Sequence, residues 1–261
     1  MTISDQDVGR WAEYLDGGLR EGKELDRISS SFPGLTVEDG YRIQAQGLTL
    51  RVKRAEKVIG LKMGLTSKAK REQMGLHSPV YGVLTDAMQV RGTYSLKGQI
   101  HPKIEPEVAF LILRELRGAV TAEQVLESCG GLCAAMEILD SRYTGFKYFS
   151  LPDVVADNSS SSQFVLGEWV RDFRALPLDR LEMSMKVDGV EAQRALSAEI
   201  SGHPVHSVVQ LCELLAREGK SLPAGSIVLA GAATVAVPLV AGQTIRLDVG
   251  SLPSVEISIT A

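Results

Sequence analysis

The chain has 261 residues, of which 44% are hydrophobic and 23% are charged, and its formal net charge is -4. Such a globular composition and length allow a core that needs neither disulfides nor a structural zinc. The slight acidity, without a dense basic stretch, argues against nucleic acid or an anionic membrane as a partner. No apolar stretch approaches the roughly 20 residues of a membrane span. Three cysteines without a CxxC pair predict reduced thiols and a cytoplasmic location.

The first fifth of the chain has the pattern of helices. Apolar side chains recur at helical spacing over residues 8–15. Thr36 is a good N-cap for a second helix. The apolar pattern changes from helical to strand-like after residue 57. We expect a single catalytic domain, 1–261, with a mainly helical N-terminal lobe over 1–57 and a metal-binding, β-rich part over 58–261.

Short strands dominate the remainder. They are expected at 58–64, 80–84, 104–113, 132–138, 164–166, 181–187, 226–230, 234–238, 244–249 and 254–259. Asp188-Gly189 is a hairpin signal after one of these strands. A short helix is expected after Thr66 or Ser67, ending near Gly75, and a longer one over 204–217. Helices followed by many strands, without regular βαβ alternation, predict an α+β fold.

Two glutamates stand close together in the segment 101–110. Glu105 and Glu107 are two residues apart on an expected strand, so their side chains share one face. Two neighbouring carboxylates repel unless a cation lies between them or one takes up a proton. Pro106 donates no ladder hydrogen bond, which indicates a sheet edge or the rim of a site. The alternative is an exposed face with two solvated glutamates.

A third acid lies in an apolar strand about thirty residues later. A buried, unpaired carboxylate is costly, so Glu137 needs a partner. With Glu105 and Glu107 it would form a hard-oxygen site suited to Mg²⁺ or Mn²⁺. The alternative is a structural salt bridge from Arg142 to Glu137 or to Asp140.

Lys62 is unusual because it stands in an apolar strand between two glycines. Such a lysine either extends its ammonium to water or has a lowered pKa and a chemical role. The polar stretch 157–162 suits the binding of a carboxylate, although alone it is only a turn.

Together these segments resemble the fumarylacetoacetate hydrolase superfamily, and within it the hydratase and decarboxylase group. The matching segments are 60–67, 79–84, 102–110, 137–142, 155–160, 202–204 and 222–226. The resemblance spans residue 36 to the C-terminus and implies a mixed β-roll fold. It implies a Mg²⁺ or Mn²⁺ ion held by Glu105, Glu107 and Glu137, and a catalytic or substrate-orienting Lys62.

Val80 indicates which of the two reactions of this group, hydration or decarboxylation, the resemblance implies. Hydratases of the group carry an aspartate at this position, and loss of that carboxylate removes a group that would manage water and protons. The segment 140–148 also resembles the decarboxylases. The implied reaction is metal-dependent decarboxylation of the 2-oxo dicarboxylic acid 2-oxo-3-hexenedioate to 2-hydroxypenta-2,4-dienoate, in the meta-cleavage degradation of aromatic compounds.

The same resemblance supplies candidate substrate-binding residues. Asn158, Ser160 and Ser161 are expected to hold a substrate carboxylate, and an apolar Val80 to leave the departing carboxylate poorly solvated. Arg142 and Lys147 are expected to orient the distal carboxylate, unless both are purely structural.

Three other functions stay open from the sequence. One is a 2-oxopent-4-enoate hydratase-type enzyme with the same metal site, and another is a non-catalytic stabilising partner of a hydratase. The third is a β-diketone or acylpyruvate hydrolase of the same superfamily, which would need a carboxylate–histidine arrangement that the sequence does not identify. The resemblance also implies that a decarboxylase of this kind associates with a hydratase, because its dienol product is unstable.

Overall fold

The computed structural model describes residues 3–67, 71–72, 76, 78–146 and 150–261. Its helices are α1 Asp5–Glu21, α2 Ile28–Ser31, α3 Val37–Lys53, α5 Ala122–Ser128, α6 Leu151–Ala156 and α7 Pro204–Arg217. Its strands are β1 Val58–Gly64, β2 Val80–Thr85, β3 Thr93–Ser95, β4 Lys103–Ile112, β5 Leu116–Arg117, β6 Cys129–Leu139, β7 Ser161–Leu166, β8 Glu182–Val187, β9 Val190–Leu196, β10 Ser221–Leu222, β11 Ile227–Leu229, β12 Val237–Pro238, β13 Thr244–Val249 and β14 Leu252–Thr260. Most of the helix expected between 67 and 75, and Lys147, lie outside the described residues.

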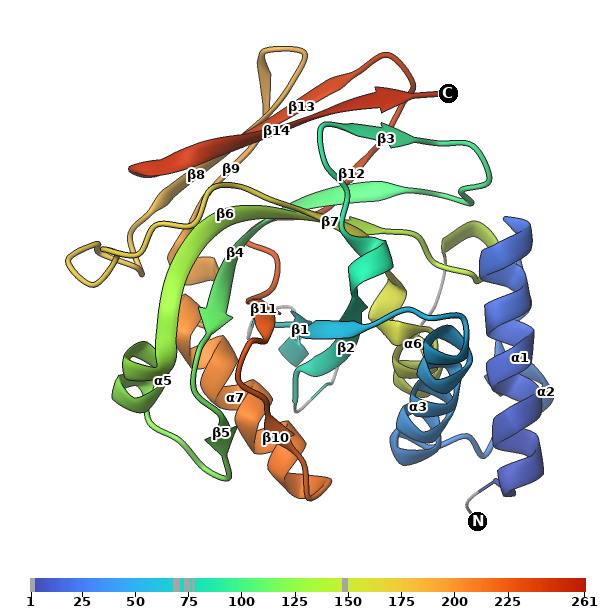
Figure 1. The fold of residues 1–261 in the computed structure, drawn as a ribbon. Coiled ribbons are helices and arrows are strands. Elements are labelled where there is room, and N and C mark those ends of the chain that lie inside the picture. Colours follow the sequence, from blue (N-terminus) through green and yellow to red (C-terminus); the bar gives the residue numbers. More distant parts are fainter. Residues whose placement is uncertain (1–2, 68–70, 73–75, 77, 147–149) are drawn as a thin grey trace.

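Two sheets form the body of the molecule (Figure 1). The larger has seven strands in the order β2-β1-β11-β4-β6-β7, with β12 also paired to β4, and the smaller has the order β3-β14-β13-β8-β9. The long strands β4 and β6 curve partway round α7, and the smaller sheet contacts β6 through β13 and β14 (Figure 1). The predicted α+β fold with a mixed β-roll is confirmed.

Local capping explains where the N-terminal helices begin and end. The Ser4 hydroxyl caps α1, and Gly22, with φ of 61°, ends it in the left-handed conformation. Thr36 and Asp39 form a reciprocal capping box at the start of α3. The apolar faces of α1 and α3 pack together in a cluster that also contains Tyr143. The helices expected within 1–57 are therefore present, and they stand beside the sheet (Figure 1).

The position of Pro106 differs from the expected sheet edge. β4 is an interior strand, paired with β6 on one side and with β11 and β12 on the other. The edge prediction was therefore wrong. The Pro106 carbonyl accepts a hydrogen bond from the Ala233 N–H at 3.1 Å, in the stretch that connects β11 to β12. The proline nitrogen faces this same interruption of the ladder, where a strand donor is not required.

Several other elements differ from the sequence predictions. The strand expected over 234–238 is reduced to Val237–Pro238. Helix α5 was not predicted, although Thr121 and Gln124 form a capping box at its start. Helix α6, with a proline in its first turn, was also missed. The hairpin at Asp188-Gly189 and the helix over 204–217 are confirmed.

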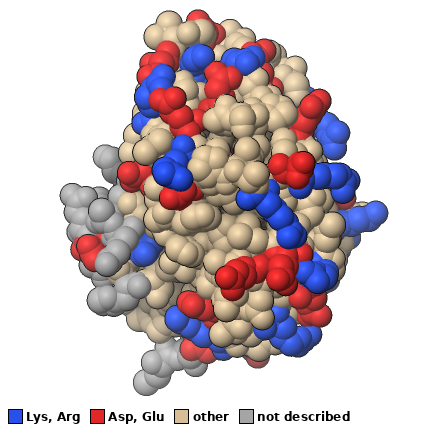
Figure 2. Space-filling model, turned by 90° about the vertical axis from the view of Figure 1, so that its left-hand side faces the viewer, with Lys and Arg blue, Asp and Glu red and all other residues tan. Residues whose placement is uncertain are grey.

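The state of the cysteines and the distribution of surface charge agree with what the composition predicts. All three cysteines are buried free thiols, and the cytoplasmic location stays a prediction. Among the described residues, no helix has the length and hydropathy that crossing a membrane requires. Acidic and basic side chains are interspersed on the face shown in Figure 2.

Candidate metal and substrate site

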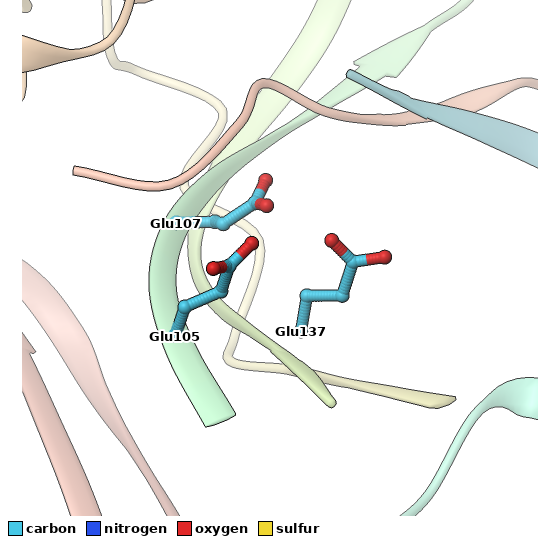
Figure 3. A group of neighbouring side chains, drawn as sticks. All are labelled: Glu105, Glu107 and Glu137. Carbon is cyan, nitrogen blue, oxygen red and sulfur yellow. The ribbon is translucent and has the colours of Figure 1, made fainter. Parts of the chain in front are cut away.

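Three glutamates converge on the inner side of the curved sheet (Figure 3). Glu105 and Glu107 project from the same face of β4, and Glu137 lies directly opposite Glu105 in the ladder to β6. One carboxylate oxygen from each residue lies within 4.8 Å of the other two. Glu107 and Glu137 are fully buried, so the alternative of solvated glutamates on an exposed face was wrong.

The surroundings of Glu107 leave one of its oxygens without a partner. Its Oε2 accepts a hydrogen bond from the Gly231 N–H at 2.7 Å. Its Oε1 is buried and makes no hydrogen bond within the described part of the chain. Burial raises the pKa of Glu107 well above its ordinary value, and the charges of Glu137 and Glu105 raise it further. An ionised Glu107 is therefore unfavourable here unless the carboxylate binds a proton or a cation.

Lys62 supplies the single ammonium that contacts the cluster in the described chain. Its Nζ donates to Glu137 Oε2 at 3.1 Å and to the Ser159 carbonyl at 2.9 Å. Burial lowers the pKa of this ammonium, but the three glutamate charges outweigh burial and raise it above its ordinary value. The expected alternatives, an ammonium in water or a lowered pKa, were both wrong. A side chain at Gly82 would lie 3.2 Å from Lys62 Cε, so glycine leaves room for the lysine.

The donor set fits a hard divalent cation. Three carboxylates facing one lysine carry a net charge of minus two, which a dication would neutralise. The unpartnered Glu107 Oε1 gives such an ion a ready ligand. Oxygen-only ligands of this kind suit Mg²⁺, Mn²⁺ or Ca²⁺ rather than a soft metal. Glu137 is already oriented by Lys62 and by the Ser161 hydroxyl, which donates to its Oε1 at 2.6 Å.

A left-handed turn holds the carbonyl that Lys62 contacts. Asn158, Ser159 and Ser160 have φ values of 49°, 53° and 59°, which is a costly conformation for consecutive residues other than glycine. The Asn158 side chain fixes the turn to β2, because it accepts from the Val83 N–H at 2.8 Å and donates to the Val83 carbonyl at 3.0 Å. The Ser159 hydroxyl donates to the Tyr81 carbonyl at 3.2 Å. The turn thus positions a backbone oxygen beside the ammonium.

Replacing Asn158 by Ala is expected to destabilise the protein by about 2 to 4 kcal/mol, because Val83 loses both partners and alanine tolerates the left-handed conformation poorly. Asn158→Gly is the matched variant, since it loses the same hydrogen bonds but not the backbone freedom. It should lie about 1 kcal/mol closer to the wild type. Urea unfolding measures both, and a loss below about 0.5 kcal/mol for the alanine variant would show that the turn is held by other contacts.

Arg142 is turned away from the three glutamates. Its guanidinium pairs with the Asp157 carboxylate and donates to the Asp140 carbonyl at 2.8 Å. The salt-bridge alternative therefore named the wrong partners, Glu137 and Asp140. Burial raises the pKa of Asp157 to about 6, while Arg142 acts to lower it. This buried pair fixes the segment between β6 and the left-handed turn.

A pocket of about 360 Å³ opens over the cluster. Of the predicted site residues, Lys62, Val80 and Glu105 line it. Asn158, Ser160 and Ser161 are not among its lining residues, whereas Ser159, which was not predicted, is one of them. Lys103 also lines the pocket and was not predicted, although the two-residue period of β4 puts it on the face of Glu105 and Glu107. Ser159 had no comparable signal, because its position depends on the backbone conformation of the turn.

The fold and site define a class: an α+β β-roll with an acidic cluster that can hold a divalent cation in an open pocket. The chain belongs to the fumarylacetoacetate hydrolase family, whose model, described as fumarylacetoacetate (FAA) hydrolase C-terminal, matches residues 67–260. The membership predicted from the sequence is thereby confirmed.

Named relatives cover nearly the whole chain. It is 40% identical over 255 residues to a 4-oxalocrotonate decarboxylase of a Pseudomonas species, covering 97% of this chain and 98% of the relative. It is 35% identical to a 2-hydroxyhexa-2,4-dienoate hydratase of Comamonas testosteroni, with 95% and 96% covered. The solved 4-oxalocrotonate decarboxylase of Pseudomonas putida G7, complexed with magnesium and adipate, has a TM-score of 0.95, 33% identity and 99% of each chain covered. Enzymes of both reaction types are thus similar to this chain.

Proposed function

We propose that residues 1–261 form a single-domain, divalent-metal-dependent carboxy-lyase. It converts 2-oxo-3-hexenedioate to 2-hydroxypenta-2,4-dienoate and CO₂ in meta-cleavage degradation of aromatic compounds. The observation that carries this proposal is the convergence of Glu105, Glu107 and Glu137 beside Lys62 in a pocket whose wall includes the apolar Val80. Similarity to a decarboxylase that binds magnesium and adipate supports the metal and the dicarboxylate substrate.

The reaction needs only a sink for two electrons. When the bond to the distal carboxylate breaks, its electron pair moves through the C3–C4 double bond into the 2-oxo group, CO₂ leaves, and the enolate oxygen takes up a proton. Mg²⁺ or Mn²⁺ held by the three glutamates would supply Lewis acidity to the 2-oxo group. Lys62 lies against the carboxylate of Glu137, and two of its three N–H donors are used by Glu137 and Ser159. The third donor is available to stabilise developing negative charge on the substrate.

Val80 favours CO₂ loss over water addition. The residue is buried and lines the pocket, so it offers no hydrogen bond to a departing carboxylate. A carboxylate that is poorly solvated gains by becoming neutral CO₂. Val80 also gives the site no carboxylate beyond the three glutamates with which to activate water.

The test is an assay of purified protein with 2-oxo-3-hexenedioate and Mg²⁺, which follows CO₂ release and dienol absorbance together, with EDTA as the control. We expect CO₂ release that EDTA abolishes. Metal-dependent turnover of 2-hydroxypenta-2,4-dienoate without CO₂ release would instead identify a hydratase. Absence of metal binding in titration calorimetry would favour a non-catalytic stabilising partner.

Replacing Val80 by Asp should lower the rate of CO₂ release by at least about tenfold. A new carboxylate beside the departing one costs more than about 1.4 kcal/mol in a buried site. The variant should also gain measurable hydration of 2-hydroxypenta-2,4-dienoate. Val80→Asn is the uncharged control of equal size. If Val80→Asp releases CO₂ as fast as Val80→Asn, the charge at this position does not decide the reaction.

Association with a hydratase stays a prediction. The dienol product is unstable, so direct transfer to the enzyme that hydrates it would limit its loss. Sedimentation velocity of a mixture of the two untagged enzymes is the direct measurement. A single faster boundary would support the association, and two independent boundaries would contradict it.

A further inference from the structure

The pocket contains a second lysine, Lys103, which forms no ion pair with a carboxylate of the described residues. Lys103 begins β4 and lies on the same face as Glu105 and Glu107, with its Cα about 7 Å from that of Glu105. It lines the pocket together with Lys62 and Val80. Within the described ranges, no carboxylate lies within ion-pair distance of its Nζ. Lys62, by contrast, is paired with Glu137.

An aromatic ring holds the Lys103 ammonium. Its Nζ lies 4.1 Å from the centre of the Phe146 ring. A cation over a ring face is attracted to it, yet all three of its N–H donors stay available to a stronger acceptor. The ring therefore keeps the ammonium at the pocket wall without accepting a hydrogen bond from its N–H donors.

The backbone at Phe146 is itself unusual. Its φ is 52°, a left-handed conformation that a bulky side chain adopts rarely and at a cost. The preceding residue, Gly145, is left-handed as well. Hydrogen bonds between Thr144 and Leu25 hold this segment against the N-terminal helices. Strain of this kind, retained beside a pocket cation, is typical of a functional site.

The metal and the glutamates provide no counter-charge for the second carboxylate of a dicarboxylic acid. A dication would bring the summed charge of the three glutamates and Lys62 to zero, and it would itself face the substrate carboxylate that lies beside it. The second carboxylate of a dicarboxylic acid would still need a counter-charge. Lys103 is the remaining cation among the described lining residues.

We infer that Lys103, supported by the Phe146 ring, binds the substrate carboxylate remote from the metal and so selects dicarboxylic over monocarboxylic acids. This inference rests on the proposed function for the identity of the substrate. It replaces Arg142, which is paired with Asp157, as the residue that recognises the distal carboxylate.

The attraction between Lys103 and the distal carboxylate is stronger in the ground state than in the transition state. The distal carboxylate loses its negative charge as CO₂ forms, so its interaction with Lys103 weakens toward the transition state. A contact that is stronger in the ground state lowers KM and does not raise kcat. Removing Lys103 should therefore raise KM for the dicarboxylate while kcat does not fall.

The decisive experiment compares adipate with hexanoate, two six-carbon acids that differ in one carboxylate, as ligands of the Mg²⁺-loaded protein in titration calorimetry. The wild type should bind adipate at least about tenfold more tightly, since a hydrogen bond to a charged group contributes about 1.5–3 kcal/mol. Lys103→Met should reduce this ratio to about one or two without changing hexanoate binding. Lys103→Arg should restore much of it, and Lys97→Met, at an exposed lysine, is the control.

An unchanged ratio in Lys103→Met would overturn the inference, as would its loss in Lys147→Met alone. The binding comparison does not require turnover. If the wild type prefers adipate through Lys103 but releases no CO₂ from 2-oxo-3-hexenedioate, the proposed reaction fails and the assignment of Lys103 stands.

Discussion

Replacing Glu107 by Gln is expected to weaken Mg²⁺ binding at least about a hundredfold and to abolish metal-dependent CO₂ release. Loss of partners that only orient metal ligands costs about 10- to 100-fold, and Glu107 would be a ligand itself. Its Oε1 is buried without a hydrogen-bond partner, so the substitution removes the acceptor that would face the ion. Titration calorimetry measures the affinity, and the assay of CO₂ release measures the activity.

Thermal unfolding separates this effect from a general loss of structure. In the absence of metal, Glu107→Gln should be at least as stable as the wild type, because it removes a buried charge that Glu137 and Glu105 repel. In the presence of excess Mg²⁺, the wild type should gain a higher Tm and Glu107→Gln should not. Glu256→Gln, on an exposed position of β14, should respond to metal as the wild type does. An undiminished metal-induced rise in Tm for Glu107→Gln would contradict the site.

The Lys62→Met substitution should lower kcat by about a hundred- to a thousandfold. Donors that stabilise developing negative charge in a buried site have effects of this size. The ammonium is fixed by Glu137 and by the Ser159 carbonyl, so its remaining N–H has a defined direction. Methionine keeps the approximate shape of the side chain and removes only the charge and the donors.

Metal affinity distinguishes a chemical role for Lys62 from a structural one. Removing a cation from beside the three carboxylates should leave Mg²⁺ binding unchanged or tighter, because the repulsion between the two cations is lost. Lys186→Met, which breaks a half-exposed pair with Asp248 in the smaller sheet, is the matched control and should retain full activity. A Lys62→Met protein that loses Mg²⁺ binding together with activity would indicate that the lysine only holds Glu137 in place.

Local sequence signals predicted the elements that depend on neighbouring residues. The N-cap at Thr36, the hairpin at Asp188-Gly189 and the helix over 204–217 arise from interactions within one or two turns of chain. The same applies to the shared face of Glu105 and Glu107, which follows from the period of a strand. The edge position expected for Pro106 failed because strand order depends on distant segments.

Charge and the cost of burial together indicated the three glutamates, and the resemblance to a family added Lys62 to their site. The sequence by itself therefore determined the fold class, the acidic cluster and the presence of a lysine beside it. It also contained Lys103 in the strand pattern, but nothing in that pattern indicated that this lysine has no carboxylate partner among the residues that the structure describes.

Only the tertiary structure decided which charges pair. The register of β4 with β6 places Glu105 opposite Glu137, and the left-handed turn brings the Ser159 carbonyl to Lys62. The fold also turns Arg142 to Asp157. These contacts join residues far apart in the chain, and their energies depend on distance and on the exclusion of water. No local pattern encodes either quantity, so sequence gives the charged groups and the fold assigns their partners.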